Sequence, residues 1–327
     1  ERPGVWGGSS PWRARHVTTP GERTPQGKKQ EAARLARERA ERRAARDFAA
    51  ADALRERIAA LGFTVTDTAD GYELRRVPVP AVRRITPAEV PSALRDPPDH
   101  DATVHWLAED WPEDVLRGIA SFRAHAPGRS VQHVVVESVP AEVEWPERVE
   151  VLRLREDPGW ARARNAGLPR TRGMIAVIAD GSIEATGDWL GPLEGALANP
   201  TVGVTGPFGL VTEELHEFVP SPGPECDAIE AYVLAVRREL LETGLAFDPR
   251  FRFYRSADID LSFRVKDRGL RATVTPLPLV QHEHRRWWST PPEVRRKLSK
   301  RNYYRFLDRW RGRTDLTVAG TATPGTG

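Results

Sequence analysis

Between residues 102 and 179, short apolar segments alternate with segments that have the composition and periodicity of helices. Hydrophobic periodicity predicts strands at 102–107, 131–138, 149–154 and 174–179, and helices at 113–126 and 159–168. Strands and helices that alternate over short connections form a parallel, doubly wound α/β sheet. We therefore expect ligands to bind beyond the carboxyl ends of these strands, near the loop after Leu107, near Glu137 and near Asp180.

The last of these strands ends on a single carboxylate, Asp180, which is followed by Gly181 and Ser182. The continuous apolar run before it, MIAVIA, is typical of a strand covered on both faces. Asp180 could reach for a substrate or a metal, or it could cap a turn, since Asp-Gly is a common turn pair. The residues alone leave both interpretations open.

Composition excludes several classes of protein. The chain has 327 residues, of which 39% are hydrophobic and 29% charged, and this length allows one large domain or two ordinary ones. It contains no apolar run of the roughly 18 residues that a membrane span requires and no secretory signal pattern, so we expect a cytoplasmic protein. Cys226 is the only cysteine, which excludes an internal disulfide and a cysteine-based zinc site. A net charge of +3 does not by itself indicate nucleic-acid binding.

The first quarter of the chain differs from the rest. Residues 1–27 are rich in Gly, Pro, Ser and Thr, and we expect a disordered leader. Residues 28–60 predict one long helix or two, with Asp47 as the cap of the second. The sequence from 61 to 77 predicts a β-hairpin around an Asp-Gly turn.

Residues 42–74, which include DFAAADALRERI and the hairpin, resemble the C-terminal segment of bacterial cysteinyl-tRNA synthetases. In that family the segment lies beside the site of tRNA recognition, so the resemblance implies a small module at 28–76 that contacts tRNA. No aminoacylation signature follows it in the sequence. A helical hairpin that docks a protein partner is an equally weighted alternative.

Prolines in residues 77–101 predict a linker, and a flexible tail is expected at 312–327. From 102 to 311 the chain resembles the family 2 glycosyltransferases of GT-A fold. The resemblance depends on the order of several motifs, namely GWARARNAGL, IADGSIEATGDWL, VGVTGPFG, and the stretch from FDPRF to HEHR. It implies a doubly wound, mostly parallel, Rossmann-like sheet. It also implies transfer of a sugar from a nucleotide-diphosphate sugar to a hydroxyl acceptor, with inversion.

The same resemblance implies a site for the donor diphosphate. Asp180 occupies the first position of the family's DxD motif, but Ser182 replaces the second aspartate. Together with His282, which the family makes its natural partner, and with His284, Asp180 would hold a divalent metal, Mn or Mg. These histidines are two residues apart and would share one side of a strand. If metal binding is weak, fixed cations could neutralise the diphosphate instead; the candidates are Arg285, Arg286, Lys297, Lys300 and Arg301.

The remaining functional residues also follow from the resemblance. Glu137 and Arg164 would contact the donor nucleotide. Asp258 would be the general base, with Asp260 as a second or supporting acid, although Ala257 replaces the first acid of the family motif. Both aspartates could instead only favour the start of a helix. Asp227 and Glu230 lie where family members recognise the acceptor, and turn or surface roles are as well supported.

The basic segment 284–312 is expected to form an amphipathic helix that packs an apolar face on the core and exposes its charges. Contact with a membrane surface or with nucleic acid is the alternative for this helix. Because Ser182 and Ala257 leave two motifs incomplete, two further functions stay open. One is a catalytically degenerate GT-A protein that binds a partner, and the other is an RNA-associated protein that acts through residues 28–76.

Overall fold

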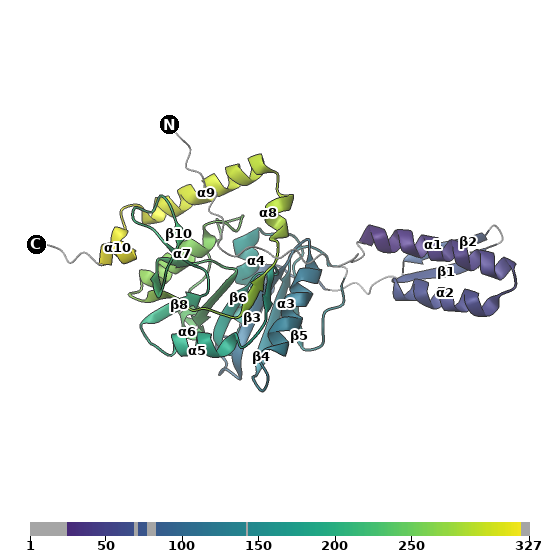
Figure 1. Cartoon of the computed structure of the whole chain (residues 1–327), viewed down its shortest axis with the longest axis horizontal. Helices are drawn as coiled ribbons and strands as arrows, with labels where there is room; N and C mark the ends of the chain where they lie inside the picture. Colours follow the sequence, from purple (N-terminus) through teal and green to yellow (C-terminus); the bar gives the residue numbers. More distant parts are fainter. Residues whose placement is uncertain (1–24, 69–70, 77–82, 142, 322–327) are drawn as a thin grey trace, which may run out of the picture. The chain divides into compact units, whose positions relative to one another are not determined.

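The computed structural model describes residues 25–68, 71–76, 83–141 and 143–321 (Figure 1). The chain divides into two compact units, one that ends at residue 83 and one that begins at Arg84. None of the helices in the described ranges has the length and apolar character needed to cross a bilayer.

The N-terminal unit consists of two helices and a hairpin. Helices α1 (Pro25–Ala44) and α2 (Phe48–Ala60) confirm the two-helix alternative, and the Asp47 carboxylate caps α2 by accepting the Ala50 N–H at 3.2 Å. Strands β1 (Phe63–Thr68) and β2 (Gly71–Arg76) pair antiparallel, as predicted. Turn residues 69–70 and the expected leader up to residue 24 lie outside the described residues, and α1 begins within the predicted leader.

This unit has its own hydrophobic core, built from both helices and the first strand: Ala32, Leu35, Ala36, Leu54, Ile58, Phe63 and Val65. The buried Arg39 guanidinium donates two hydrogen bonds to the Asp67 carboxylate, at 2.7 and 3.0 Å, and so ties α1 to β1. The core and the ion pair between α1 and β1 both lie within this unit.

The larger unit contains an eight-stranded sheet with the order β11-β14-β8-β13-β6-β3-β4-β5. Its bounds are β3 (His100–Ala108), β4 (Val131–Glu137), β5 (Val149–Arg153), β6 (Gly173–Ala179), β8 (Val202–Gly206), β11 (Glu225–Cys226), β13 (Val233–Arg237) and β14 (Arg271–Val274). Strands β3, β4, β5 and β6 are parallel neighbours, as are β8 and β14, whereas β13 is antiparallel to β6 and β8. The sheet is therefore mostly parallel, which confirms the predicted α/β class.

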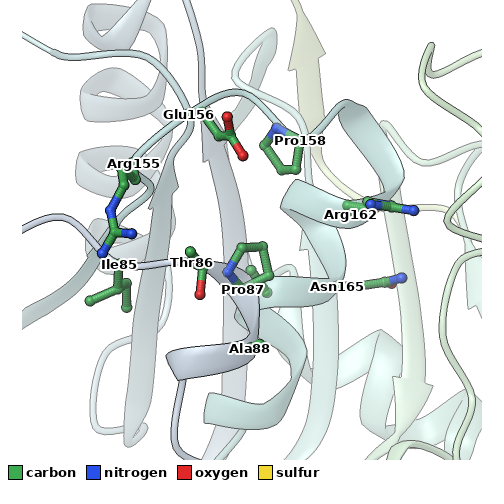
Figure 2. A pocket seen from close by; sticks show the side chains of 10 residues that line it. Ile85, Thr86, Pro87, Ala88, Arg155, Glu156, Pro158, Arg162 and Asn165 are labelled. Atoms are coloured by element: carbon green, nitrogen blue, oxygen red, sulfur yellow. The ribbon is translucent and has the colours of Figure 1, made fainter.

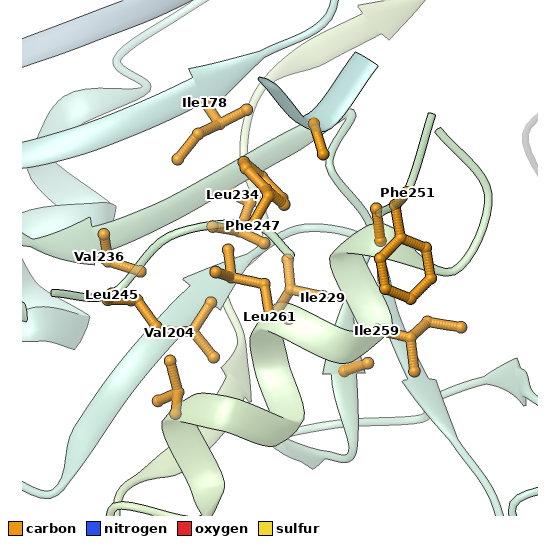
Figure 3. Close-up of a cluster of buried hydrophobic side chains, with 14 of the residues drawn as sticks. Ile178, Val204, Ile229, Leu234, Val236, Leu245, Phe247, Phe251, Ile259 and Leu261 are labelled. Carbon is orange, nitrogen blue, oxygen red and sulfur yellow. The ribbon is translucent and has the colours of Figure 1, made fainter. Parts of the chain in front are cut away.

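Helices cover both faces of this sheet. Helices α3 (Pro112–Ala124) and α5 (Leu190–Leu197) pack on one face, and α4 (Trp160–Gly167), α6 (Arg238–Glu242), α7 (Ala257–Lys266) and α9 (Pro292–Trp310) contribute to the core on the other. Strand β6 alternates between them, because Val177 packs on the α3 side and Ile178 on the α7 side (Figure 3). This arrangement explains why its sequence is apolar at every position.

Two small sheets lie beside the large one. Strand β7 (Ile183–Ala185) follows the Asp180 loop and pairs antiparallel with β15 (Leu279–Gln281), which leads into the short helix α8 (Arg285–Ser289). The other sheet has the order β10-β9-β12 and consists of β9 (Gly209–Val211), β10 (Val219–Pro220) and β12 (Ala228–Ile229). The β7–β15 pairing brings the segment around residue 282 back to the end of β6.

Two segments differ from expectation. The expected linker, 77–101, packs on the large unit from Arg84 onward; Ile85 bridges Leu154, and a 3-10 helix, η1, spans Pro87–Glu89. The prolines prevent long helices and strands in this segment, but they do not prevent it from packing on the large unit. The expected tail, 312–327, forms a 3-10 helix, η3 (Thr314–Leu316), and α10 (Val318–Thr321) before the described residues end.

Candidate functional site

Asp180 lies at the carboxyl end of β6, where its two carboxylate oxygens have different surroundings. Its Oδ1 accepts hydrogen bonds from the Ser182 N–H at 2.9 Å and from the Ser182 hydroxyl at 2.6 Å, which closes the turn. Its Oδ2 instead faces His284 Nε2 at 3.8 Å and Arg164 Nη2 at 4.0 Å. One oxygen therefore caps the loop while the other points at cationic groups.

The surroundings keep Asp180 ionised. Burial would raise the pKa of this carboxyl, but His284, the Ser182 hydroxyl and the Arg164 guanidinium outweigh burial and hold the pKa below its ordinary value. Ser182 stands where the DxD motif of the resembled family has its second aspartate. It orients the Asp180 carboxylate through two hydrogen bonds and adds no negative charge.

Arg164 reaches Asp180 from inside the protein. Its guanidinium is 3% exposed and donates to the backbone oxygens of His105, at 3.1 Å, and Ala179, at 2.9 Å. Burial lowers the pKa of Arg164 to about 10, and the guanidinium also stacks 5.4 Å from the Trp160 ring. Arg164 therefore links β3 to the end of β6 and places a positive charge on the interior side of Asp180.

The two predicted histidine ligands separate in the structure. His282 Nε2 lies 2.6 Å from a Glu184 carboxylate oxygen, whereas His284 is the histidine that faces Asp180. The expectation of a shared strand face was wrong because β15 ends at Gln281 and the chain turns into α8. His284 packs between the rings of Tyr232 and Tyr254, with centroid separations of 5.7 and 4.8 Å.

Within the described ranges, no group of three or more His, Cys, Asp or Glu side chains is placed to hold a metal ion. Asp180 and His284 nevertheless present one carboxylate oxygen and one imidazole nitrogen 3.8 Å apart, at a point where no other acid lies within ion-pair distance of His284. Divalent cations such as Mn²⁺ accept both donor types. The pair fits two positions of a coordination sphere whose other ligands come from outside the protein.

The predicted phosphate-binding arginines have acidic partners. Arg285 pairs with Glu113 at 2.6 Å and with Asp114 at 3.3 Å, both in the first turn of α3, and Arg286 pairs with Glu109. Burial lowers the pKa of Arg286 to about 10. The α8 arginines therefore hold the histidine segment against the ends of β3 and α3, while the candidates Lys297, Lys300 and Arg301 are exposed on α9.

The half-buried Asp258, at the start of α7, accepts the N–H groups of Ala231, at 3.0 Å, and Ile259, at 2.9 Å. Burial raises the pKa of Asp258, although these hydrogen bonds and Arg255 oppose the rise. Burial, and secondly the charge of Asp258, also raise the pKa of Glu230 to about 7. These two acids form an electrostatically coupled pair with Arg255 beside them.

Asp260 differs from expectation because it faces the core. It is 1% exposed, accepts the Trp310 indole N–H at 2.8 Å and pairs with Arg264 at 2.6 Å. Two residues along a helix turn the side chain about 200°, so Asp258 and Asp260 on α7 cannot face the same way. The second acid therefore fastens α9 to α7.

Asp227 also has a buried, fully paired carboxylate. Its carboxylate is fully buried and binds the Lys266 ammonium at 2.9 Å and the N–H groups of Thr212 and Val318 at 2.7 and 2.6 Å. Each oxygen has a partner, so the residue stabilises the packing of the C-terminal segment. Of the two predicted acceptor residues, only Glu230 lies in the site.

Glu137 ends β4 as predicted, but its side chain is covered. Arg84, from the segment expected to be a linker, donates to it at 2.8 Å; Arg153 lies at 3.4 Å and the Trp145 indole N–H at 3.3 Å. Glu137 is 2% exposed. A nucleotide at this edge would contact the more exposed Arg84 side chain and not the covered Glu137 carboxylate.

A cavity of about 470 Å³ lies next to this contact, between the 85–88 segment, the loop after β5, and α4. Figure 2 shows Arg155 and Glu156 at the strand side and Arg162 at the helix side. Asn165 also lines it, but its amide is used by the Phe247 backbone, to which it donates at 2.8 Å and from which it accepts at 2.9 Å. The cavity is thus bordered by two arginines and one acid near the covered Glu137.

Sequence reasoning missed several residues of the site. Tyr232 and Tyr254 enclose His284, Glu184 holds His282, and Glu109 pairs with Arg286. Tyr254 ends the aromatic stretch FRFY and Glu109 follows the first strand, so both had a local signal. No local pattern in the sequence pointed to Glu184 or Tyr232, because their positions depend on the pairing of β7 with β15 and of β6 with β13.

No protein family description matches this sequence, and no curated protein matches it. Among solved structures, GalNAc-T7 with UDP, GalNAc and Mn²⁺ is similar with a TM-score of 0.55 and 15% identity; the match covers 66% of this chain and 49% of that one. The mannosyltransferase PcManGT from Pyrobaculum calidifontis, in complex with GDP-Man and Mn²⁺, matches at a TM-score of 0.44 and 18% identity, over 72% of this chain and 79% of that one. The match thus spans about half of the GalNAc-T7 chain. The likeness to GalNAc-T7, with the mostly parallel sheet, shows that the fold is that of the GT-A glycosyltransferases.

Proposed function

We propose that this protein is a glycosyltransferase that moves a sugar from a nucleotide-diphosphate sugar to a hydroxyl acceptor. The observation that carries the proposal is the arrangement at the carboxyl edge of the sheet. An ionised Asp180 faces His284 at 3.8 Å, and the half-buried acids Asp258 and Glu230 lie near the same two tyrosines that enclose His284. Besides burial, the charges of Asp180 and Asp258 raise the pKa of Tyr254, and those of Glu230 and Asp180 raise the pKa of Tyr232. The fold shared with GalNAc-T7, which was solved with UDP, GalNAc and Mn²⁺, supports the same class of donor.

On the donor side, Asp180 and His284 would hold a divalent metal, with the donor diphosphate and water as the other ligands. When bound, such a metal neutralises the charge that develops on the leaving diphosphate. Ser182 orients the Asp180 carboxylate, and Arg164 keeps it ionised from behind. The pairing of Arg285 and Arg286 with acids argues that these arginines position α8 and do not clamp phosphate directly.

On the acceptor side, Asp258 would take the proton of the attacking hydroxyl. Burial raises the pKa of this carboxyl and so makes it a stronger base than an exposed aspartate. Its two backbone hydrogen bonds, to Ala231 and Ile259, fix the carboxylate while it accepts the proton. A single displacement from the face opposite the diphosphate would invert the anomeric carbon, and Glu230 would contact the acceptor beside the base.

The competing proposal is a GT-A protein that binds a partner or a nucleotide sugar without transferring the sugar. Ser182 and Ala257, which replace two acids of the family motifs, favour it. A third proposal is tRNA or protein contact through residues 28–76, which is favoured by the basic sequence of α1 and by the independent core of that unit. The three proposals differ in the ligand that the protein is expected to bind and in whether it transfers a sugar.

Titration calorimetry with UDP, GDP and dTDP sugars, each with and without Mn²⁺, tests the first proposal. We expect metal-dependent binding of one donor class that Asp180→Asn weakens at least about tenfold, because the metal would lose its anionic ligand. Asp188→Asn is the matched control. It makes the same chemical change at a carboxylate outside the site, which accepts backbone N–H groups at the start of α5. Binding without donor turnover under any acceptor mixture would favour the degenerate protein. No binding of any donor would refute the transferase and leave only the form of the competing proposal in which the protein binds a partner.

A further inference from the structure

One surface of the large unit carries positive charge that nothing in the described chain neutralises. On α9, Arg296, Lys297, Lys300 and Arg301 are exposed, and none pairs with a carboxylate among the residues that the structure describes. The segment 295–301 contains five cations and no acid. The acids of α9, Glu293 and Asp308, lie near its two ends, so the excess charge is concentrated on the middle turns.

These cations share one face because of helical geometry. Residues 296, 297, 300, 301 and 304 fall within an arc of about 140° at 100° per residue. The other side is fixed to the core, where Phe306 and Trp310 are buried and the Asn302 amide donates to the backbone oxygen of Phe253 at 2.6 Å. The cationic face therefore cannot rotate inward, and Figure 1 shows α9 along the outside of this unit.

Apolar side chains border the cationic face. Trp288, on α8, is 66% exposed, Tyr304 is 48% exposed and Val294 is 41% exposed. The preceding indole, Trp287, is held between the guanidinium groups of Arg255 and Arg295, at 5.3 and 3.9 Å from its ring centroid, which fixes α8 against α9. A large exposed indole next to unpaired lysines and arginines is the composition of a helix that lies in a lipid headgroup layer.

We propose that the α8–α9 face, defined by Trp288, Val294, Arg296, Lys297, Lys300, Arg301 and Tyr304, docks this protein on an anionic lipid surface. The four cations attract acidic headgroups, and Trp288 with Val294 inserts at the level of the headgroups. Single-stranded nucleic acid is the less suitable partner, because it is typically bound in a positively charged groove. Here the charges lie on an outward-facing helix.

The face is also continuous with the candidate site. Trp287 contacts Arg255, which acts on Asp258 and Glu230, and α8 follows directly on His284. Docking through α8–α9 would hold the acceptor side of the site close to the lipid surface. The binding itself does not depend on the proposed sugar transfer and is tested without it.

Vesicle co-sedimentation of the full chain tests the proposal. We expect binding to vesicles of phosphatidylcholine and phosphatidylglycerol at 7:3 in about 0.1 M salt, and little binding to pure phosphatidylcholine. Replacing Arg296, Lys297, Lys300 and Arg301 by glutamine should weaken binding about tenfold or more. The matched control replaces four exposed arginines of the N-terminal unit by glutamine, Arg37, Arg46, Arg55 and Arg57, and should bind like the unmodified chain.

Trp288→Ser, which leaves the charge unchanged, should weaken binding at least about threefold, and circular dichroism with thermal melting confirms that each variant is folded. Failure of the unmodified chain to bind the anionic vesicles would overturn the proposal. So would equal losses in the α9 variant and the N-terminal control. Binding of a single-stranded RNA that requires the four α9 cations, without vesicle binding, would assign the face to nucleic acid instead.

Discussion

The two edges of the central sheet both carry many charged side chains, but they arrange them differently. At the amino edge, Arg172 pairs with Asp99 and Arg129 pairs with Asp101, around a cavity of about 620 Å³. At the carboxyl edge, Asp258 and Glu230 are half-buried and have no ion-pair partner among the described residues, and Asp180 has only the more distant His284 and Arg164. Paired, partly exposed charges add solubility, whereas buried acids reduce stability and are typical of functional sites.

The largest effect should follow from removing the charge of Asp180. We expect Asp180→Asn to lower donor turnover at least about 100-fold, because the metal would lose its only anionic protein ligand. Release of nucleotide diphosphate from the donor identified by calorimetry measures the effect. Equal losses in Asp180→Asn and in the amino-edge variant Arg172→Gln would contradict the functional distinction between the two edges.

Asp260 tests whether burial alone distinguishes the acids. It is buried near the carboxyl edge but fully paired, with Arg264 and the Trp310 indole. We expect Asp260→Ala to lower the free energy of unfolding by about 3 kcal/mol, because it removes a buried carboxylate, leaves the Trp310 indole N–H without its acceptor and leaves Arg264 with Asp248 alone. Urea unfolding measures this value. Asp258→Asn, the matched control on the same helix, should not destabilise the protein.

Glu230 should make stability depend on pH. Its pKa of about 7 lies above the ordinary value of 4.5, so the folded state binds the proton more tightly than the unfolded state. The stability that this provides is complete below pH 4.5 and is lost as the pH rises through 7; it amounts to about 3 kcal/mol. Urea unfolding of the protein and of Glu230→Gln between pH 4.5 and 8 measures it. Parallel curves for the two proteins would contradict the raised pKa of this acid.

The comparison of the edges also shows what the sequence could predict. The alternation of strands and helices predicted the sheet, and the end of β6 predicted the position of Asp180, because both depend on local periodicity. The partner of Asp180 depended on where β15 ends. The sequence did not predict the partners of Asp227 and Glu137, because these come from distant segments, at Val318 and Arg84. Local patterns place a carboxylate at an edge but do not specify what reaches it from elsewhere in the chain.

His284 and His282 provide a test of that partner within one segment. His284→Ala should weaken Mn²⁺-dependent donor binding about tenfold, or about 1.4 kcal/mol, because it removes the imidazole that faces Asp180. His282→Ala should change binding less than about threefold, since His282 contacts Glu184. Calorimetry with and without Mn²⁺ measures both variants, and the reverse order would return the ligand role to His282.

The smallest effect is expected at the amino edge. Arg172 pairs with Asp99, but both side chains are more than 40% exposed, so solvent screens the pair. We expect Arg172→Gln to lower the free energy of unfolding by less than about 1 kcal/mol and to leave donor binding unchanged. Urea unfolding in 0.05 and 0.5 M salt measures the change, which should shrink at the higher salt. A loss as large as that expected for Asp260→Ala would mean that the amino-edge pairs act as a network essential to the sheet, and the two edges would then differ in function but not in their contribution to stability.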